Sequence, residues 1–198
     1  MDKLVEIKRI CEENYSEEDY RYHILQVVKY SLLLAKKLNA NLEIVEVAAY
    51  LHDIGRAKKK RKFEGERKDF FEDNDHHITG ADETKEILKD LGYDEEFINK
   101  VEHCVLAHRG RKGPAPETKE AKIIACADAM SHFDTFLDLF SFFLKTTNSF
   151  EEAVIKIEQK IDRNWDKKLM LPEAKEIVKD KYEAIKLLIN SMKECMEK

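Results

Sequence analysis

The stretch that decides the fold is residues 48–56, AAYLHDIGR, in which an apolar segment runs directly into a His-Asp pair. The apolar spacing before the pair is typical of a buried helix, yet His52 and Asp53 are both polar. Burying a carboxylate without a partner is costly, so we expect a cation beside Asp53. Taken alone, the dipeptide is also compatible with a surface pair at a helix end.

Helical spacing of apolar residues extends from this stretch over nearly the whole chain. The 198 residues include only 6 Gly and 3 Pro, too few for the tight turns of a β-sandwich or barrel. The sequence therefore predicts an all-α protein of about eight helices, with a main bundle in residues 1–145 and a C-terminal helical extension, 146–198, packed on it. Helices are predicted over residues 2–13, 16–38, 41–55, 79–92, 94–109, 117–145, 149–163 and from 172 onward.

Two further polar side chains are predicted to point inward. His23 shares a helical face with Val27 and Leu34, whereas the lysines of that helix fall on another face. Asp128 lies on a face with small side chains such as Ala125, which leave room around a buried carboxylate. Two histidines and two aspartates form a mixed N/O donor set that suits Zn²⁺, Mn²⁺, Fe²⁺ or Ni²⁺. The candidate ligands are His23, His52, Asp53 and Asp128.

The ordered set H23…H52-D53…D128 resembles the HD-domain superfamily of metal-dependent phosphohydrolases, and HDIG matches that family's commonest form. The resemblance spans roughly residues 16–140. It implies a compact all-α bundle, one or two divalent metal ions (Mn, Ni, Zn, Fe, Co or Mg) held by these four residues, and hydrolysis of phosphate esters, often in nucleotides. Asp53 would orient the attacking water and accept its proton.

His77 and His108 are candidates for a second metal site or for catalysis. The pattern His-x-x-Gly-Ala that begins at His77 is similar to one in dinuclear members of the family. Helical phase favours His77 over His76, and it places His108 rather than His103 inside the apolar arc of the next helix. We expect His77 and His108 either to bind a weaker second metal or to act as phosphate ligands or proton donors.

Basic residues are the candidates for substrate binding. Residues 56–68, RAKKKRKFEGERK, contain eight Lys/Arg and two Glu, a local charge of +6 in a chain of net charge −5. Such a loop can attract an anionic substrate, although a solvated charged loop is the alternative. From this loop, Arg56 and Lys59 are predicted to contact a phosphate group of the substrate. Arg109, which follows His108, and His132 complete the predicted substrate-binding set.

The function predicted is a metal-dependent phosphohydrolase that acts on a small phosphate ester or anhydride, with a nucleotide favoured. The alternatives are a dinuclear iron oxygenase of the same fold and a regulatory module that binds a nucleotide or metal without turnover. The net charge of −5 excludes a protein whose main role is to coat nucleic acid, and no stable complex with nucleic acid is expected.

A cytoplasmic location without membrane contact is expected, because no apolar run approaches 18 residues and no signal-peptide pattern begins the chain.

The Phe-rich stretch 133–150 is predicted to pack in the core. A homodimer interface and an apolar wall for a base stay open as its alternatives.

Overall fold

The computed structural model describes residues 2–56, 75–109 and 113–196, and every regular element within these ranges is a helix, as predicted. Lys59 and most of the basic loop lie outside the described residues. The elements are α1 (Lys3–Asn14), α2 (Glu17–Asp19), the π-helix η1 (Tyr20–Ile24), α3 (Leu25–Leu38), α4 (Leu42–Leu51), α7 (His76–Asp90), α8 (Glu95–Ala107), α9 (Lys119–Asp134), α10 (Phe136–Thr146), α11 (Phe150–Arg163), the π-helix η3 (Asn164–Lys168) and α12 (Pro172–Met196).

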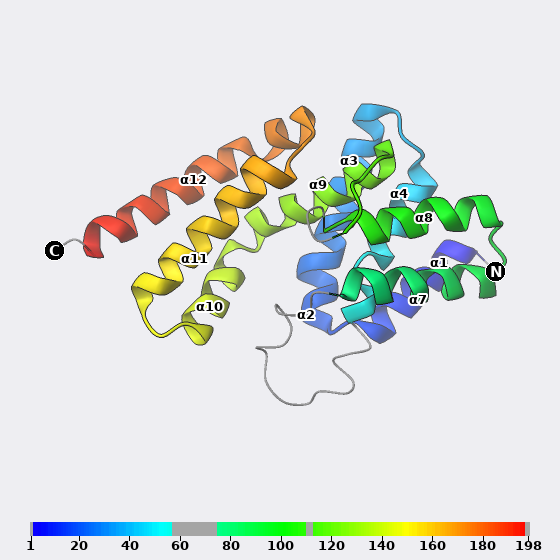
Figure 1. Cartoon of the computed structure of the whole chain (residues 1–198), viewed down its shortest axis with the longest axis horizontal. Helices are drawn as coiled ribbons and strands as arrows, with labels where there is room; N and C mark the ends of the chain where they lie inside the picture. Colours follow the sequence, from blue (N-terminus) through cyan, green and yellow to red (C-terminus); the bar gives the residue numbers. More distant parts are fainter. Residues whose placement is uncertain (1, 57–74, 110–112, 197–198) are drawn as a thin grey trace.

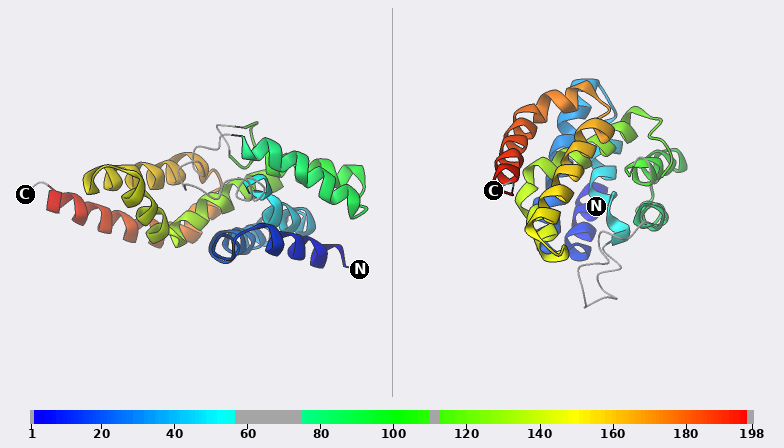
Figure 2. Two further views of the ribbon diagram at one scale, coloured as in Figure 1. Left: turned by 90° about the horizontal axis from the view of Figure 1, so that it is seen from below. Right: turned by 60° about the vertical axis from the view of Figure 1, so that its left-hand side comes forward.

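Three helices, α3, α4 and α9, form the centre of the molecule. The α7–α8 pair packs against this centre on the side of the N-terminus, while α10, α11 and α12 extend toward the opposite end (Figures 1 and 2). The core between them is aliphatic and fully buried, with Leu34, Leu51 and Ile124 among its largest side chains. None of the helices in the described ranges combines the length and apolar character needed to cross a membrane.

Helix starts follow the capping signals in the sequence. The side chains of Asn41, Asp94 and Ser149 each accept a hydrogen bond from a backbone amide in the first turn of the helix that follows. Each such cap is worth about 1 kcal/mol of helix stability. Pro172 opens α12, where its missing amide proton costs nothing.

Two predicted helices are interrupted in the structure. The helix expected over residues 16–38 contains the π-helix η1, and the one expected over 117–145 divides at Thr135 into α9 and α10. The Thr135 hydroxyl donates to the Ser131 carbonyl at 3.2 Å, and its backbone leaves the helical region with φ −100° and ψ 25°. A side chain that bonds the preceding turn in this way bends a helix.

Candidate metal centre

The four predicted ligands meet in the interior of the molecule from three different segments. His23 comes from η1, His52 and Asp53 from the turn that ends α4, and Asp128 from α9. The His23 Nε2 atom lies 3.2 Å from His52 Nε2, 3.4 Å from Asp53 Oδ2 and 3.8 Å from Asp128 Oδ1. The ligand atoms of His23, His52 and Asp53 lie within 4.8 Å of one another, and those of His23 and Asp128 form an adjoining set with His132.

Hydrogen bonds fix the tautomers of the two rings. The Nδ1 atom of His52 lies 2.8 Å from the Ala49 carbonyl, which can only accept, so Nδ1 carries the proton. Ser131 Oγ donates to the Asp128 carbonyl at 2.8 Å and therefore accepts from His23 Nδ1 at 3.1 Å. Both Nε2 atoms are left with bare lone pairs that face each other at 3.2 Å. A cation between them removes this repulsion, so the donor set fits a divalent metal ion.

A second group of ligand atoms shares the Asp53 carboxylate. His76 Nε2 lies 3.2 Å and His108 Nε2 3.4 Å from Asp53 Oδ1, the oxygen that does not face His23. His108 donates its Nδ1 proton to the Val105 carbonyl at 2.6 Å, so its Nε2 is also a bare lone pair. Asp53 Oδ1 is buried and makes no hydrogen bond of good geometry with the described residues. Asp53 thus belongs to two sets of candidate ligands, one with His23 and His52 and one with His76 and His108.

Of the two adjacent histidines of α7, His76 contacts Asp53, whereas the predicted His77 is not part of a candidate ligand group. The reason is a close approach between α7 and the His-Asp turn. A Cβ on Gly55 would lie 2.3 Å from the His76 carbonyl oxygen and 2.6 Å from Gly80 N. Gly80 is four residues after His76 and shares its helix face, so packing Gly80 on Gly55 turns His76 toward Asp53.

His108, the other histidine expected near the metal, is the C-cap residue of α8. His108 belongs to the second group and is buried. His103 lies on the opposite side of α8, where its Nε2 accepts a hydrogen bond from the Glu117 amide at 3.3 Å.

Electrostatics keeps the ligands in the protonation states that metals require. Burial raises the pKa of Asp53, but Arg56 and the His52, His108 and His23 rings outweigh it and hold that pKa well below its usual range. Burial lowers the pKa of His52 to about 4. At neutral pH the carboxylate is therefore charged and the imidazole neutral, which are the forms that bind metal.

The remaining predicted contacts surround the two groups. Arg56 Nε lies 3.3 Å from Asp53 Oδ1, and burial lowers the pKa of His77, with smaller contributions from His108, His76 and Arg109. His132 stacks on His23 with ring centroids 5.8 Å apart. The Asn164 amide lies 3.2 Å from His132 Nδ1; if it donates there, His132 Nε2 carries a proton and acts as a donor, not a ligand.

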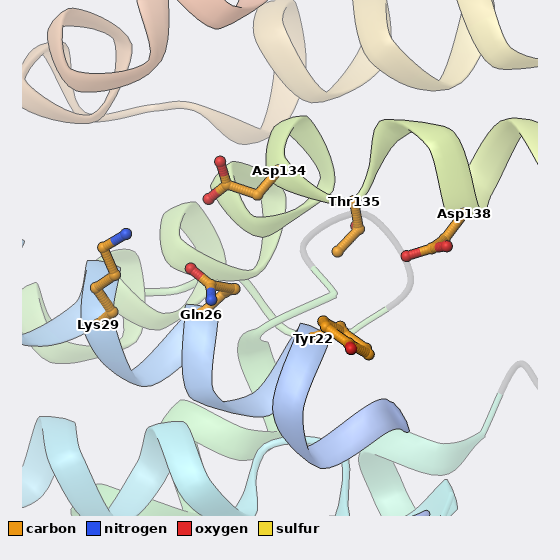
Figure 3. A pocket seen from close by; sticks show the side chains of 6 residues that line it. All are labelled: Tyr22, Gln26, Lys29, Asp134, Thr135 and Asp138. Atoms are coloured by element: carbon orange, nitrogen blue, oxygen red, sulfur yellow. The ribbon is translucent and has the colours of Figure 1, made fainter. Parts of the chain in front are cut away.

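Two features near the centre have no counterpart in the sequence-based prediction. Lys168, from η3, lies 2.8 Å from Asp128 Oδ2, although 40 residues separate the two in sequence. A polar hollow of about 290 Å³ lies at the junction of η1, α3, α9 and α10 (Figure 3). Its lining residues are Tyr22, Gln26, Lys29, Asp134, Thr135 and Asp138.

The metal-free protein should lose stability as pH falls from about 6.5 to about 4. Burial lowers the pKa of His52 from 6.5 to about 4 and also lowers the pKa values of His76 and His132. The unfolded chain then binds protons in a pH range where the folded chain does not, so acid favours unfolding. His52 alone accounts for about 3 kcal/mol of the unfolding free energy across this range. Urea denaturation at about pH 7 and pH 4.5 measures the effect, and equal unfolding free energies would contradict it.

Comparison with known sequences places this centre in a family. The family model for the HD domain matches residues 20–132. Ribonuclease Y of Thermosipho melanesiensis is 35% identical over 109 residues, which cover 55% of this chain but 18% of ribonuclease Y. An uncharacterized protein of Methanocaldococcus jannaschii is 30% identical over 137 residues, which cover 62% of this chain and 69% of that protein. The chain thus matches less than a fifth of the length of ribonuclease Y.

Solved structures share the fold beyond the matched domain. Bacillus subtilis YpgQ superposes with a TM-score of 0.73 at 19% identity, covering 97% of this chain and 94% of YpgQ. The same protein in complex with ADP gives a TM-score of 0.72. The C-terminal helices are therefore included in the shared fold. With the HD-domain match spanning more than half of its length, the chain belongs to the HD-domain family.

Proposed function

We propose that this protein is a metal-dependent phosphohydrolase whose substrate is a small phosphate ester or anhydride, a nucleotide in particular. The observation that carries the proposal is the Asp53 carboxylate, buried between two groups of histidines whose Nε2 atoms face it. His23, His52, Asp53 and Asp128 would hold one divalent ion, and Asp53, His76 and His108 a second.

A bound divalent metal would lower the pKa of a water molecule to about 7 and offset the charge of the phosphate. The protein's own groups have matching roles. Asp53, charged at neutral pH, can accept a hydrogen bond from the attacking water and orient it. Arg56, whose Nε lies 3.3 Å from Asp53 Oδ1, would pair with a phosphate oxygen, and His132, if its Nδ1 accepts from Asn164, would donate a hydrogen bond from Nε2.

The hollow lined by Tyr22 and Gln26 supports a nucleotide as the substrate. Its aromatic side chain, Tyr22, is 58% exposed and free to stack on a base, and the Gln26 amide can both donate and accept hydrogen bonds. YpgQ, which shares the fold, has been solved with ADP. The ribonuclease Y relatives make an RNA phosphodiester the second candidate substrate.

Metal reconstitution followed by a product screen tests the proposal. Protein loaded with Mn²⁺, Zn²⁺, Fe²⁺, Co²⁺, Ni²⁺ or Mg²⁺ is incubated with nucleoside mono-, di- and triphosphates and with a short RNA, and phosphate, pyrophosphate and cleaved RNA are measured. We expect release from a nucleotide with at least one metal and none after chelation.

Two outcomes of that screen would overturn the proposal. Oxygen consumption by the Fe²⁺ protein without phosphate release would indicate an oxygenase. Tight nucleotide binding by the metal-loaded protein with no product would indicate a regulatory module. Cleavage of RNA alone would retain the reaction class and replace the substrate.

A further inference from the structure

The carboxylate of Asp128 divides its two oxygen atoms between two cation positions. Oδ1 lies 3.8 Å from His23 Nε2, a nitrogen that belongs to the candidate metal ligands. Oδ2 lies 2.8 Å from the ammonium nitrogen of Lys168. The Asp128 side chain is 9% exposed and that of Lys168 is 21% exposed. One oxygen thus faces the metal centre, while the other already has a fixed positive charge beside it.

The chain anchors Lys168 along the face of α9 that carries the site residues. Asp128 and His132 lie four residues apart on α9 and therefore share a face. In the opposite order, Lys168 contacts Asp128, and the Asn164 side-chain nitrogen lies 3.2 Å from His132 Nδ1. Asn164 and Lys168 are the first and last residues of the π-helix η3, a conformation that is rare and occurs often at functional sites. Two contacts one turn apart therefore hold η3, and Lys168 with it, against α9.

The ion pair neutralises Asp128 in the metal-free protein. Burial raises the pKa of Asp128, but Lys168 foremost, with three nearby histidine rings, outweighs burial and holds that pKa well below its usual range. A buried carboxylate without a cation is costly, and Lys168 removes that cost. A divalent ion at Oδ1 gains less from a carboxylate that is already paired, and the ammonium on the other oxygen repels it. Both effects lower the affinity for metal.

We propose that Lys168 is a positioning residue of the metal centre, which keeps Asp128 Oδ2 away from the metal and weakens the binding of a divalent ion beside His23. The inference rests on the metal binding in the proposed function and not on hydrolysis. Lys168 lies outside residues 20–132, the part of the chain that matches the HD-domain model. A residue of the C-terminal helices would therefore set the metal affinity of the HD domain.

Calorimetric titration of the metal-free protein with Mn²⁺ tests the role of Lys168. Lys168→Met and Lys168→Gln should each raise the affinity of one Mn²⁺-binding step at least about 10-fold, because a unit charge and a divalent ion a few ångströms apart repel by this much even in water. Lys168→Arg keeps the charge and should bind Mn²⁺ as the wild type does. Lys167→Met is the matched control, because Lys167 is the exposed neighbour in η3. Its Mn²⁺ affinity should equal that of the wild type.

Thermal unfolding separates the charge of Lys168 from its effect on folding. Lys168→Met leaves Asp128 without its cation, so the metal-free variant should have a lower Tm than the wild type. Glutamine can still donate a hydrogen bond to Oδ2, so Lys168→Gln decides the question if Lys168→Met does not fold. Mn²⁺ should raise the Tm of the neutral variants more than that of the wild type, because a ligand stabilises a protein according to its affinity.

The results also separate this role from the proposed reaction. Equal or weaker Mn²⁺ binding by both neutral variants, tighter binding by Lys168→Arg, or no Mn²⁺ binding by any of the proteins would overturn the role of Lys168. Tighter Mn²⁺ binding by the neutral variants without nucleotide turnover by the wild type would keep that role and reject the phosphohydrolase. Turnover by the wild type with unchanged Mn²⁺ affinity in the neutral variants would reject the role of Lys168 alone.

Discussion

Replacing Asp53 with Ala is expected to abolish turnover and to remove bound metal, the largest effect of any single substitution in this chain. Asp53 Oδ2 lies 3.4 Å from His23 Nε2, while Oδ1 faces both His76 and His108. The substitution therefore removes the one carboxylate that both ligand groups share. We expect activity to fall by at least about 1,000-fold, beyond the 10–100-fold loss that follows removal of a residue that merely supports a ligand.

Asp53→Asn separates the effect of charge from that of shape. The amide keeps the volume of the side chain but lacks the negative charge, so this variant should lose metal as Asp53→Ala does. Asp82→Ala is the control, because Asp82 is exposed on α7 and lies outside the two groups. Metal content by mass spectrometry, far-ultraviolet circular dichroism and product release measure the three properties. Full metal occupancy and activity in either Asp53 variant would disprove the assignment.

Much of this arrangement could be predicted because it depends on residues within single helices. The caps at Asn41 and Ser149 act over three residues, so the sequence alone locates the helix starts. The inward direction of His23 and Asp128 follows from apolar neighbours on the same helical face. In the structure these side chains meet His52 and Asp53.

The parts that could not be predicted depend on contacts between distant segments. His76 faces Asp53 because Gly80 packs on Gly55, a contact between α7 and the His-Asp turn that the helical phase of α7 alone cannot predict. Gly80 lies four residues after His76 and three after His77, so the sequence places this glycine on the face of both histidines and does not choose between them. Lys168 reaches Asp128 only through the path of α11 and η3, and in sequence it resembles any exposed lysine of a charged helix.

The contact of α7 with Asp53 leads to the second large effect, a difference between two adjacent histidines. His76→Gln should reduce kcat by about 10–100-fold and weaken the second of two metal-binding steps, because it removes a ligand atom 3.2 Å from Asp53 Oδ1. His77→Gln should change kcat by less than about 3-fold, since the His77 ring packs near Gly113 and joins neither group. Glutamine keeps most of the side-chain volume, which limits the loss of stability from a cavity.

Kinetics at saturating metal, Mn²⁺ titration and thermal unfolding of both variants decide between the two residues. His103→Gln serves as the control, because His103 lies across α8 from the centre and bonds the Glu117 amide. Thermal unfolding identifies a variant that loses activity only because it unfolds. If His77→Gln lost more activity and more metal than His76→Gln, the second group would have to be rebuilt around His77. The close packing of Gly55 on α7 would then not describe the active form of the protein.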